Sequence, residues 1–139
     1  MEIRVVITSV SGERLIGPEE RLPPRIHINT NLNILAIRER SETAIDIPFI
    51  AQFVYVPSVA QISIKGIILV RGSKEELDKI RRAHQERKPV PPPILHAATT
   101  TSIVEAVLIA RELAVPPPIA TPPPVGVQQP QRGTASYTI

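Results

Sequence analysis

The sequence predicts an α+β domain in which an antiparallel sheet of four strands is followed by a short helix and a long helix. Between residues 2 and 71, apolar and polar side chains alternate in four runs separated by turn-forming residues, as they do in strands. After Gly72 the apolar spacing becomes helical, in two segments separated and followed by Pro-Pro-Pro triplets. The chain has 139 residues, of which 42% are hydrophobic but only 3% aromatic, so we expect a single core built mainly from aliphatic side chains.

The first two strands are predicted over residues 2–10 and from residue 25 onward, each with one aliphatic face. The other face of the second strand carries a polar row: His27, Asn29, Asn31 and Asn33. Such a row is either a surface that recognises a ligand or a sheet face whose amides hydrogen-bond across strands. The charged residues 38–42 are predicted to reverse the chain.

Two further strands are predicted over residues 45–56 and 61–71, and each contains one residue that disturbs a regular ladder. Pro48 has no N–H group to donate, so it should lie at a strand start, a sheet edge or a bulge. Gly66 interrupts an isoleucine-rich strand, which predicts a bulge in that strand or the close approach of another backbone.

Two helices are predicted after the strands. Ser73 and Glu76 form the pattern of a capping box, so a helix should start there and end before Pro89. The long helix is predicted over residues 94–114 and is apolar on nearly all sides, so it should be nearly surrounded in the folded protein. Its longest apolar run, 103–114, is shorter than the ~20 residues of a membrane-spanning helix, so we expect no membrane span.

The domain is predicted to occupy residues 1–115, followed by a proline-rich C-terminal extension, 116–139, that is largely extended or disordered. The chain has no cysteine, and its first residues lack the basic and apolar regions of a secretory signal, so we expect a cytoplasmic protein. The absence of cysteine, together with many Ile, Val and Pro residues, fits a thermophile source.

The sequence contains none of the common catalytic patterns, such as a glycine-rich phosphate loop, HExxH, CxxC or GxSxG. The three histidines have no second ligand at metal spacing, so we expect no metal, no cofactor and no enzymatic activity. Glu105 and Glu112 lie seven residues apart on the long helix, as an acid/base pair can. We interpret them instead as the solvent-facing line of that helix, or as partners of Arg111.

The predicted apolar surface exceeds what one long helix can cover. Phe49, Phe53 and Tyr55 share one face of their strand, and Val54 and Val56 lie on the other. Large exposed apolar patches mark interfaces or binding grooves. We therefore expect a homo-oligomer, either a dimer or a tetramer, with grooves that accept extended apolar polypeptide.

Several stretches of the chain resemble the SecB-type export chaperones. Residues 31–34 resemble the start of that family's second strand, and residues 61–68 resemble the strand that leads into its first helix. Residues 94–97 and 111–122 resemble the two ends of its long helix and the small-residue and proline run that follows. The similarity extends over about residues 1–125.

This resemblance implies a SecB-like fold, assembly as a dimer of dimers, and a role in protein transport. The partners it implies are unfolded or extended polypeptides, held in long grooves of the oligomer. The side chains of this sequence that match the groove positions come from the strands and from the segment after the long helix: Phe49, Phe53, Tyr55, Val56, Ile67, Leu69, Ile119 and Val125.

An alternative function follows from the charge. The net charge is +3, and basic residues concentrate at the end of the short helix: Arg81, Arg82, Arg87 and Lys88. In a small basic structural or assembly protein, these side chains would contact the phosphates of a nucleic acid. The same run is also typical of a solvated helix end, where cations complement the helix dipole.

Overall fold

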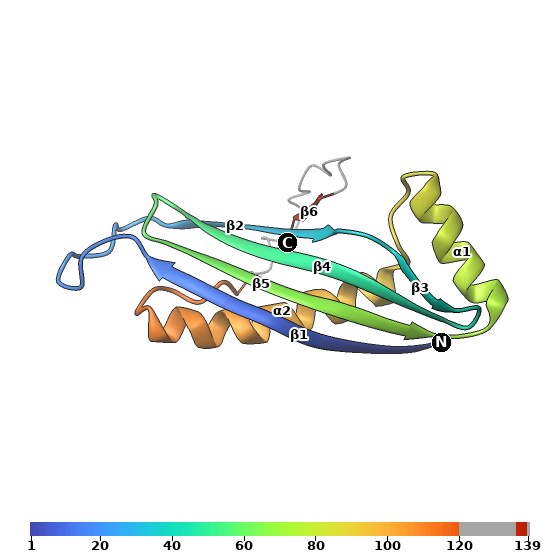
Figure 1. Ribbon diagram of the computed structural model, residues 1–139. Helices are drawn as coiled ribbons and strands as arrows, with labels where there is room; N and C mark the ends of the chain where they lie inside the picture. The colour runs from blue at the N-terminus through green and yellow to red at the C-terminus, as the bar shows by residue number, and fades with distance from the viewer. Residues whose placement is uncertain (120–135, 139) are drawn as a thin grey trace.

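The computed structural model of the protein describes residues 1–119 and 136–138. Six strands form one antiparallel sheet: β1 (Glu2–Arg14), β2 (His27–Ile34), β3 (Arg38–Ser41), β4 (Ala44–Val56), β5 (Ala60–Arg71) and β6 (Ser136–Thr138). Their order is β1-β5-β4-β2-β6, and β3 pairs with β4 beyond the end of β2. Helix α1 (Lys74–Gln85) lies at one end of the sheet, and helix α2 (Pro92–Glu112) runs along one of its faces (Figure 1).

The predicted α+β class is confirmed, and the four predicted strands correspond to β1, β2, β4 and β5. Two strands were not predicted. The charged segment interpreted as a reversal forms β3, whose four residues are all exposed, and the chain turns only at residues 42–43. A strand exposed on both faces has no apolar alternation to reveal it. Strand β6 has three residues, too few to show a period.

The pairing of β1 with β5 is irregular opposite Gly66. Ile7 pairs with Gly66, and Ser9 pairs with the residue just before it, so Thr8 is the extra residue of a bulge. The bulge therefore lies in β1 and not in β5, where the sequence predicted it. The predicted close approach of a backbone is confirmed, because a Cβ atom on Gly66 would lie 2.7 Å from the carbonyl oxygen of Val6.

Pro48 explains why β2 and β3 are separate strands. Strand β4 pairs with β2 through residues 49–56 and with β3 through residues 44–46, and Pro48 lies between these ranges. The amide of Leu35 donates to the carbonyl oxygen of Pro48 at 2.9 Å, but Pro48 has no N–H group with which to return a bond. The β2 ladder ends there, so Pro48 lies at a local break in pairing inside β4 and not at a strand start.

Helix α2 packs closely on the sheet because its inner side is built from small residues. Four of them, spaced four residues apart, are buried: Ala98, Ser102, Ala106 and Ala110. The approach is tightest at β1, where a Cβ atom on Gly12 would overlap the side chain of Ile109. The helix covers the face of the sheet that carries Phe49, Phe53 and Tyr55, and this layer forms the core.

By length and composition alone, α2 is also apolar enough to cross a membrane. It has 21 residues, and its most apolar 18-residue window has a mean hydropathy of 1.4. This is weak evidence for a span, since a core helix of a soluble protein passes the same criteria. In this structure one side of the helix lies against the sheet.

The C-terminus of α2 is fixed by β1 and by its own cap. Arg14 Nη1 donates to the carbonyl oxygens of Leu113 at 2.9 Å and Ala114 at 3.1 Å. Ala114 adopts a left-handed backbone with φ 53°, and the amide of Val115 donates to the Ala110 carbonyl oxygen at 3.0 Å. This is a Schellman cap in which alanine occupies the position that glycine usually takes.

Candidate functional site

The face of the sheet opposite α2 is not covered by either helix, and we call it the outer face. Along β4, residues 45, 47, 49, 51, 53 and 55 are buried, whereas Gln52, Val54 and Val56 between them are exposed. Val54 is 41% exposed and Val56 46% exposed. Since successive side chains of a strand point to opposite faces, the outer face of one copy presents apolar side chains directly to solvent.

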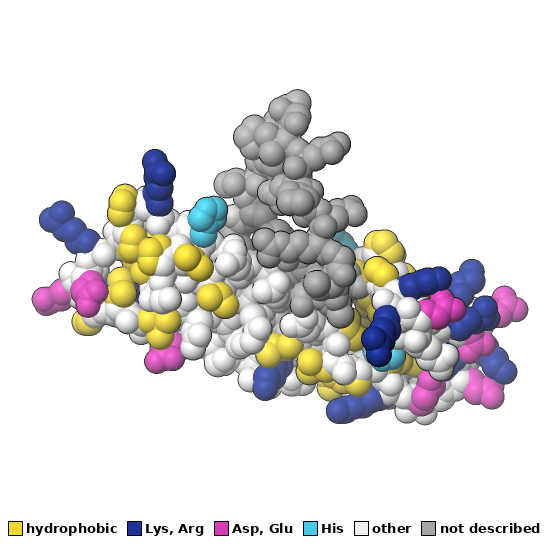
Figure 2. Space-filling model, turned by 90° about the horizontal axis from the view of Figure 1, so that it is seen from above, with side chains coloured by type: hydrophobic (Ala, Val, Ile, Leu, Met, Phe, Trp, Pro, Cys, Tyr) yellow, Lys and Arg dark blue, Asp and Glu magenta, His cyan; other side chains and the backbone are white. Residues whose placement is uncertain are grey.

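Apolar side chains form two groups on the outer face. Val54 and Val56 form one group at the end of β4. Val6, Ile67 and Leu69 form the other on β1 and β5, where Val6 pairs with Ile67. Seen from above, hydrophobic side chains gather on both sides of the grey residues, and charged side chains concentrate toward the two ends of the molecule (Figure 2).

A polar hollow of about 310 Å³ lies beside the first group, on β1, β4 and β5. Its lining combines two aliphatic side chains and a glycine with five polar side chains: Val54, Ile62, Gly12, Ser11, Glu13, Gln52, Gln61 and Ser63. Hydrogen-bonding side chains next to a pair of exposed valines can accept a polypeptide, which has a polar backbone and apolar side chains.

The polar row of β2 borders the Val54 group. His27 pairs with Val56 and Asn29 with Val54 across the β2–β4 ladder. Asn31 and Asn33 continue the row on the same face, since residues two apart in a strand share a face. The row therefore lies at the margin of an apolar surface.

The predicted groove residues fall into three sets. Phe49, Phe53 and Tyr55 have no exposed surface. They lie under α2 in the core and do not line an open groove, because the large aromatic rings occupy the face of β4 that the helix covers. The sequence showed that these three residues share a face of the strand but not which face would be covered.

Val56, Ile67 and Leu69, in contrast, all lie on the outer face. Ile67 and Leu69 belong to the second apolar group, several residues along the strands from Val56. Ile119 is 61% exposed in the segment after α2, and Val125 lies outside the described residues. The structure thus brings Ile67 and Leu69 together on the outer face, and it places Phe49, Phe53 and Tyr55 together in the core instead.

Tyr55 anchors the segment that follows α2. Its hydroxyl donates to the carbonyl oxygen of Pro116, and Val115 and Pro118 nearby are buried. Burial raises the pKa of Tyr55 to about 12, because the charged phenolate would lose its hydration in the core. The segment that carries Ile119 is therefore attached to the core through this hydrogen bond.

The side of α2 that faces away from the sheet carries an exposed apolar surface, which the sequence did not predict. Val104 and Leu108 lie one turn apart and are 55% and 52% exposed. The helix was expected to be nearly surrounded, but within one copy only its sheet-facing side is covered. The spacing of Val104 and Leu108 could have identified this ridge.

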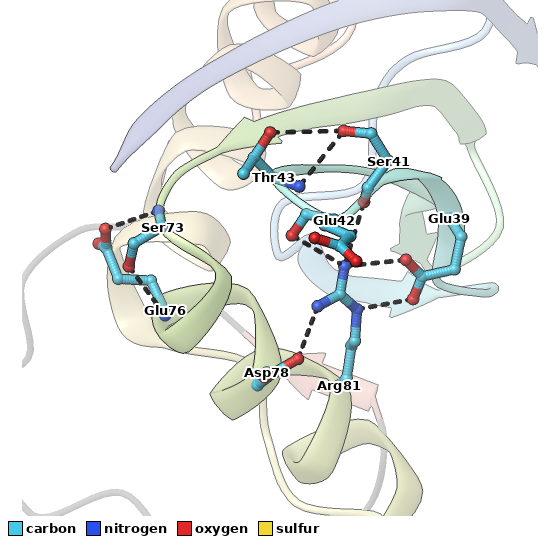
Figure 3. Close-up of polar contacts among 8 residues, drawn as sticks. All are labelled: Glu39, Ser41, Glu42, Thr43, Ser73, Glu76, Asp78 and Arg81. Atoms are coloured by element: carbon cyan, nitrogen blue, oxygen red, sulfur yellow. Dashed lines mark hydrogen bonds and ion pairs between the residues drawn. The ribbon is translucent and has the colours of Figure 1, made fainter.

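The predicted phosphate-contacting residues do not form one basic surface. Arg81 donates to both carboxylate oxygens of Glu39 at 2.7 and 2.8 Å and to Asp78 at 2.8 Å, which joins α1 to β3 (Figure 3). The hydrogen bonds to Glu39 are the main reason that the pKa of Arg81 is raised. Lys88 pairs with Glu86 at 2.8 Å, while Arg82 and Arg87 are exposed. Arg81 is thus an intramolecular tie, and its side chain is only 18% exposed.

No metal centre is evident in the part of the chain that the structure describes, where no three His, Asp or Glu side chains cluster as ligands would. His27, His84 and His96 lie on β2, α1 and α2, respectively, and all three are exposed. Glu105 is half-buried and Glu112 exposed on α2.

The arrangement of these elements has a counterpart among solved structures. The chain is similar to the SecB-like chaperone Rv1957 of Mycobacterium tuberculosis, solved in complex with a ChAD peptide from the Rv1956 HigA1 antitoxin, with a TM-score of 0.52. The similarity covers 84% of each chain at 14% sequence identity. The chain has a SecB-like fold. At this identity the similarity concerns the fold alone, and no protein-family model or curated protein matches the sequence.

Proposed function

We propose that the protein is a SecB-like chaperone that binds polypeptides, capturing extended apolar segments of non-native proteins on the surface of a homo-oligomer. The observation that carries this proposal is the open outer face, where Val54 and Val56 border a polar hollow and an amide row. A surface that mixes exposed aliphatic side chains with polar groups, of which only Glu13 in the hollow is charged, suits many sequences, because most of its contacts require no specific charge on the ligand.

Two further observations support the proposal. The SecB-like fold is shared with a chaperone that was solved with a bound peptide. Arg81, one of the basic side chains proposed to contact phosphate, is engaged by Glu39 and Asp78, which weakens the alternative of phosphate binding there. A role in protein transport within the cytoplasm is part of the same proposal.

The oligomer that we propose, a dimer or a tetramer, has two surfaces available for its contacts. Strand β1 is a sheet edge of 13 residues with β5 on one side and no strand on the other in the described part of the chain. The α2 ridge of Val104 and Leu108 is a second unpaired apolar surface. Edge strands and apolar helix faces are common sites of association between copies.

The test is suppression of aggregation of reduced α-lactalbumin, followed by light scattering at defined ratios of protein to substrate. We expect suppression at near-stoichiometric ratios. The double variant Val54→Gln/Val56→Gln should need an about tenfold higher ratio, since it removes two exposed valines from the proposed contact. A parallel titration with short RNA at two salt concentrations addresses the alternative function, for which affinity would fall steeply with salt.

A second variant, Val104→Gln/Leu108→Gln, removes two similarly exposed apolar side chains from the α2 ridge, which is one of the two proposed contacts between copies. Its oligomeric mass, measured by light scattering after size exclusion, reports on the proposed contact between copies. Absence of suppression by the unsubstituted protein, or equal suppression by the outer-face variant, would contradict the proposed function.

A further inference from the structure

The edge of β2 that faces away from β4 pairs with β6, the C-terminal strand of the same chain. Strand β6 lies beside β2, close to the C-terminus (Figure 1). Three antiparallel pairs make up the register: Ser136 with Asn33, Tyr137 with Leu32 and Thr138 with Asn31. The polar, aromatic, polar sequence of β6 therefore matches the polar, apolar, polar sequence of β2 position by position.

The direction of the β2 backbone groups follows from the hydrogen bond of Leu35 to Pro48. In an antiparallel ladder, the N–H and C=O groups of alternate residues point to the same neighbouring strand. Since Leu35 donates to Pro48 of β4, Asn33 and Asn31 also point to β4. Leu32, between them, points its N–H and C=O groups to the opposite side, where Tyr137 is its partner.

The acceptor edge is longer than its occupant. Strand β2 has eight residues and β6 has three. Beyond the three paired residues, Ile28, Thr30 and Ile34 also direct their backbone groups to this edge by the same alternation, and no further strand pairs there in the described part of the chain. An extended segment longer than β6 can therefore form more backbone hydrogen bonds with β2 than β6 does.

We propose that the edge of β2 is a strand-acceptor site for an extended polypeptide segment, and that the chain's own C-terminal strand occupies this site until such a segment displaces it. The inference rests on the proposed function and deepens it, because it names the backbone through which a polypeptide is held. The fitting segment alternates polar residues with aromatic or aliphatic ones, so that the apolar residues lie in register with Ile28, Thr30, Leu32 and Ile34.

The site has a defined end. The β2 ladder stops where Pro48 interrupts pairing at Leu35, so a bound strand extends from there toward His27 and spans at most the eight residues of β2. Val54 and Val56 pair with Asn29 and His27, so they lie on the sheet face opposite to Ile28, Thr30 and Leu32. A segment bound at the edge therefore turns its apolar residues toward the face that α2 covers and its polar residues toward the outer face.

The experiment uses the full chain and two proline variants that differ only in which backbone amide they remove. Tyr137→Pro deletes an N–H group that points to β2, whereas Ser136→Pro deletes one that points away from it. The probe is a fluorescein-labelled peptide with the sequence of residues 132–139. Binding is measured by fluorescence anisotropy, and amide hydrogen exchange of β2 is measured by NMR.

We expect Tyr137→Pro to bind the peptide about tenfold or more tightly than the unsubstituted protein, because a tethered strand competes at an effective concentration on the order of millimolar. Ser136→Pro should behave like the unsubstituted protein. In Tyr137→Pro the backbone amide hydrogen of Leu32 should exchange about tenfold faster, and added peptide should restore its protection. The exchange rates of the Asn31 and Asn33 backbone amides should stay unchanged, because these amides point to β4. A peptide with proline in place of its tyrosine should not bind.

Equal peptide affinity for all three proteins, or Leu32 exchange that Tyr137→Pro leaves unaltered, would overturn the inference. Suppression of α-lactalbumin aggregation by the same proteins separates this failure from failure of the proposed function. If none of the three suppresses aggregation, the proposed function fails, and the role of the edge in capture fails with it. If all suppress equally while peptide binding and exchange do not respond, only the β2 edge inference is overturned.

Discussion

Substituting Gly66 tests the packing between β1, β5 and the aromatic layer under α2. A Cβ atom at this position would lie 2.7 Å from the carbonyl oxygen of Val6 and 2.8 Å from two ring carbons of Phe49. Ordinary contacts of a Cβ atom are 3.4–4 Å, so the backbone of β1 and a fully buried ring would both have to move in Gly66→Ala.

The expected loss of stability is the difference between two effects. Overpacking a well-filled core costs about 1–3 kcal/mol. Replacing glycine by alanine stabilises by about 0.4–1 kcal/mol, because it reduces the freedom of the unfolded chain. For Gly66→Ala we therefore expect a net decrease of about 1–2 kcal/mol in the free energy of unfolding.

Urea unfolding followed by circular dichroism measures this difference, at a protein concentration held constant for all variants. The control is Gly17→Ala, because the nearest atoms to a Cβ there belong to the flexible side chain of Glu20, at 3.2 Å or more. Gly17→Ala should be as stable as the unsubstituted protein or slightly more stable. The packing argument is wrong if Gly66→Ala unfolds at the same urea concentration as Gly17→Ala.

Three further predictions concern stability. Ala114→Gly should raise the free energy of unfolding by about 1 kcal/mol, because alanine is strained in the left-handed cap of α2; an unchanged urea midpoint would contradict this. Ser102→Ala should stabilise by about 1 kcal/mol in the same assay, because the buried Ser102 hydroxyl has no hydrogen-bond partner in the described part of the chain. A loss of stability would show that the hydroxyl has a partner. Stability should fall as the pH rises from 10 to 12, because the Tyr55 of the unfolded chain ionises near 10 while the folded chain holds that proton to about 12. Tyr55→Phe should reduce this pH dependence, and an identical pH profile for both proteins would refute the assignment.

Local features of the chain were predictable because their causes lie within a few residues. Ser73 accepts from the Glu76 amide at 3.2 Å, and the Glu76 carboxylate accepts from the Ser73 amide at 3.1 Å, as the capping pattern predicts. The same contacts lower the pKa of Glu76. The alternation within each long strand likewise determined that Phe49 and Phe53 share one face and Val54 and Val56 the other.

The candidate site was predictable only in part, because its exposure depends on distant segments. Ile67 and Leu69 were named as binding residues and lie on the open face, whereas Phe53 and Tyr55 were named on the same grounds and are buried. Both faces of β4 are apolar, so period alone could not tell which of them α2 would cover. In the sequence Arg81 belongs to a basic run, and only the structure shows that it pairs with Glu39, 42 residues away.

The sequence by itself determined four of the six described strands with their two faces, the two helices and the N-terminal cap of α1, since these depend on residue spacing and on hydrogen bonds between near neighbours. Only the tertiary structure decided which sheet face α2 covers, that the bulge opposite Gly66 lies in β1, and that the C-terminal strand pairs with β2. These outcomes arise from contacts between segments far apart in the chain. Their energies depend on how surfaces fit together in space, which residue spacing does not record.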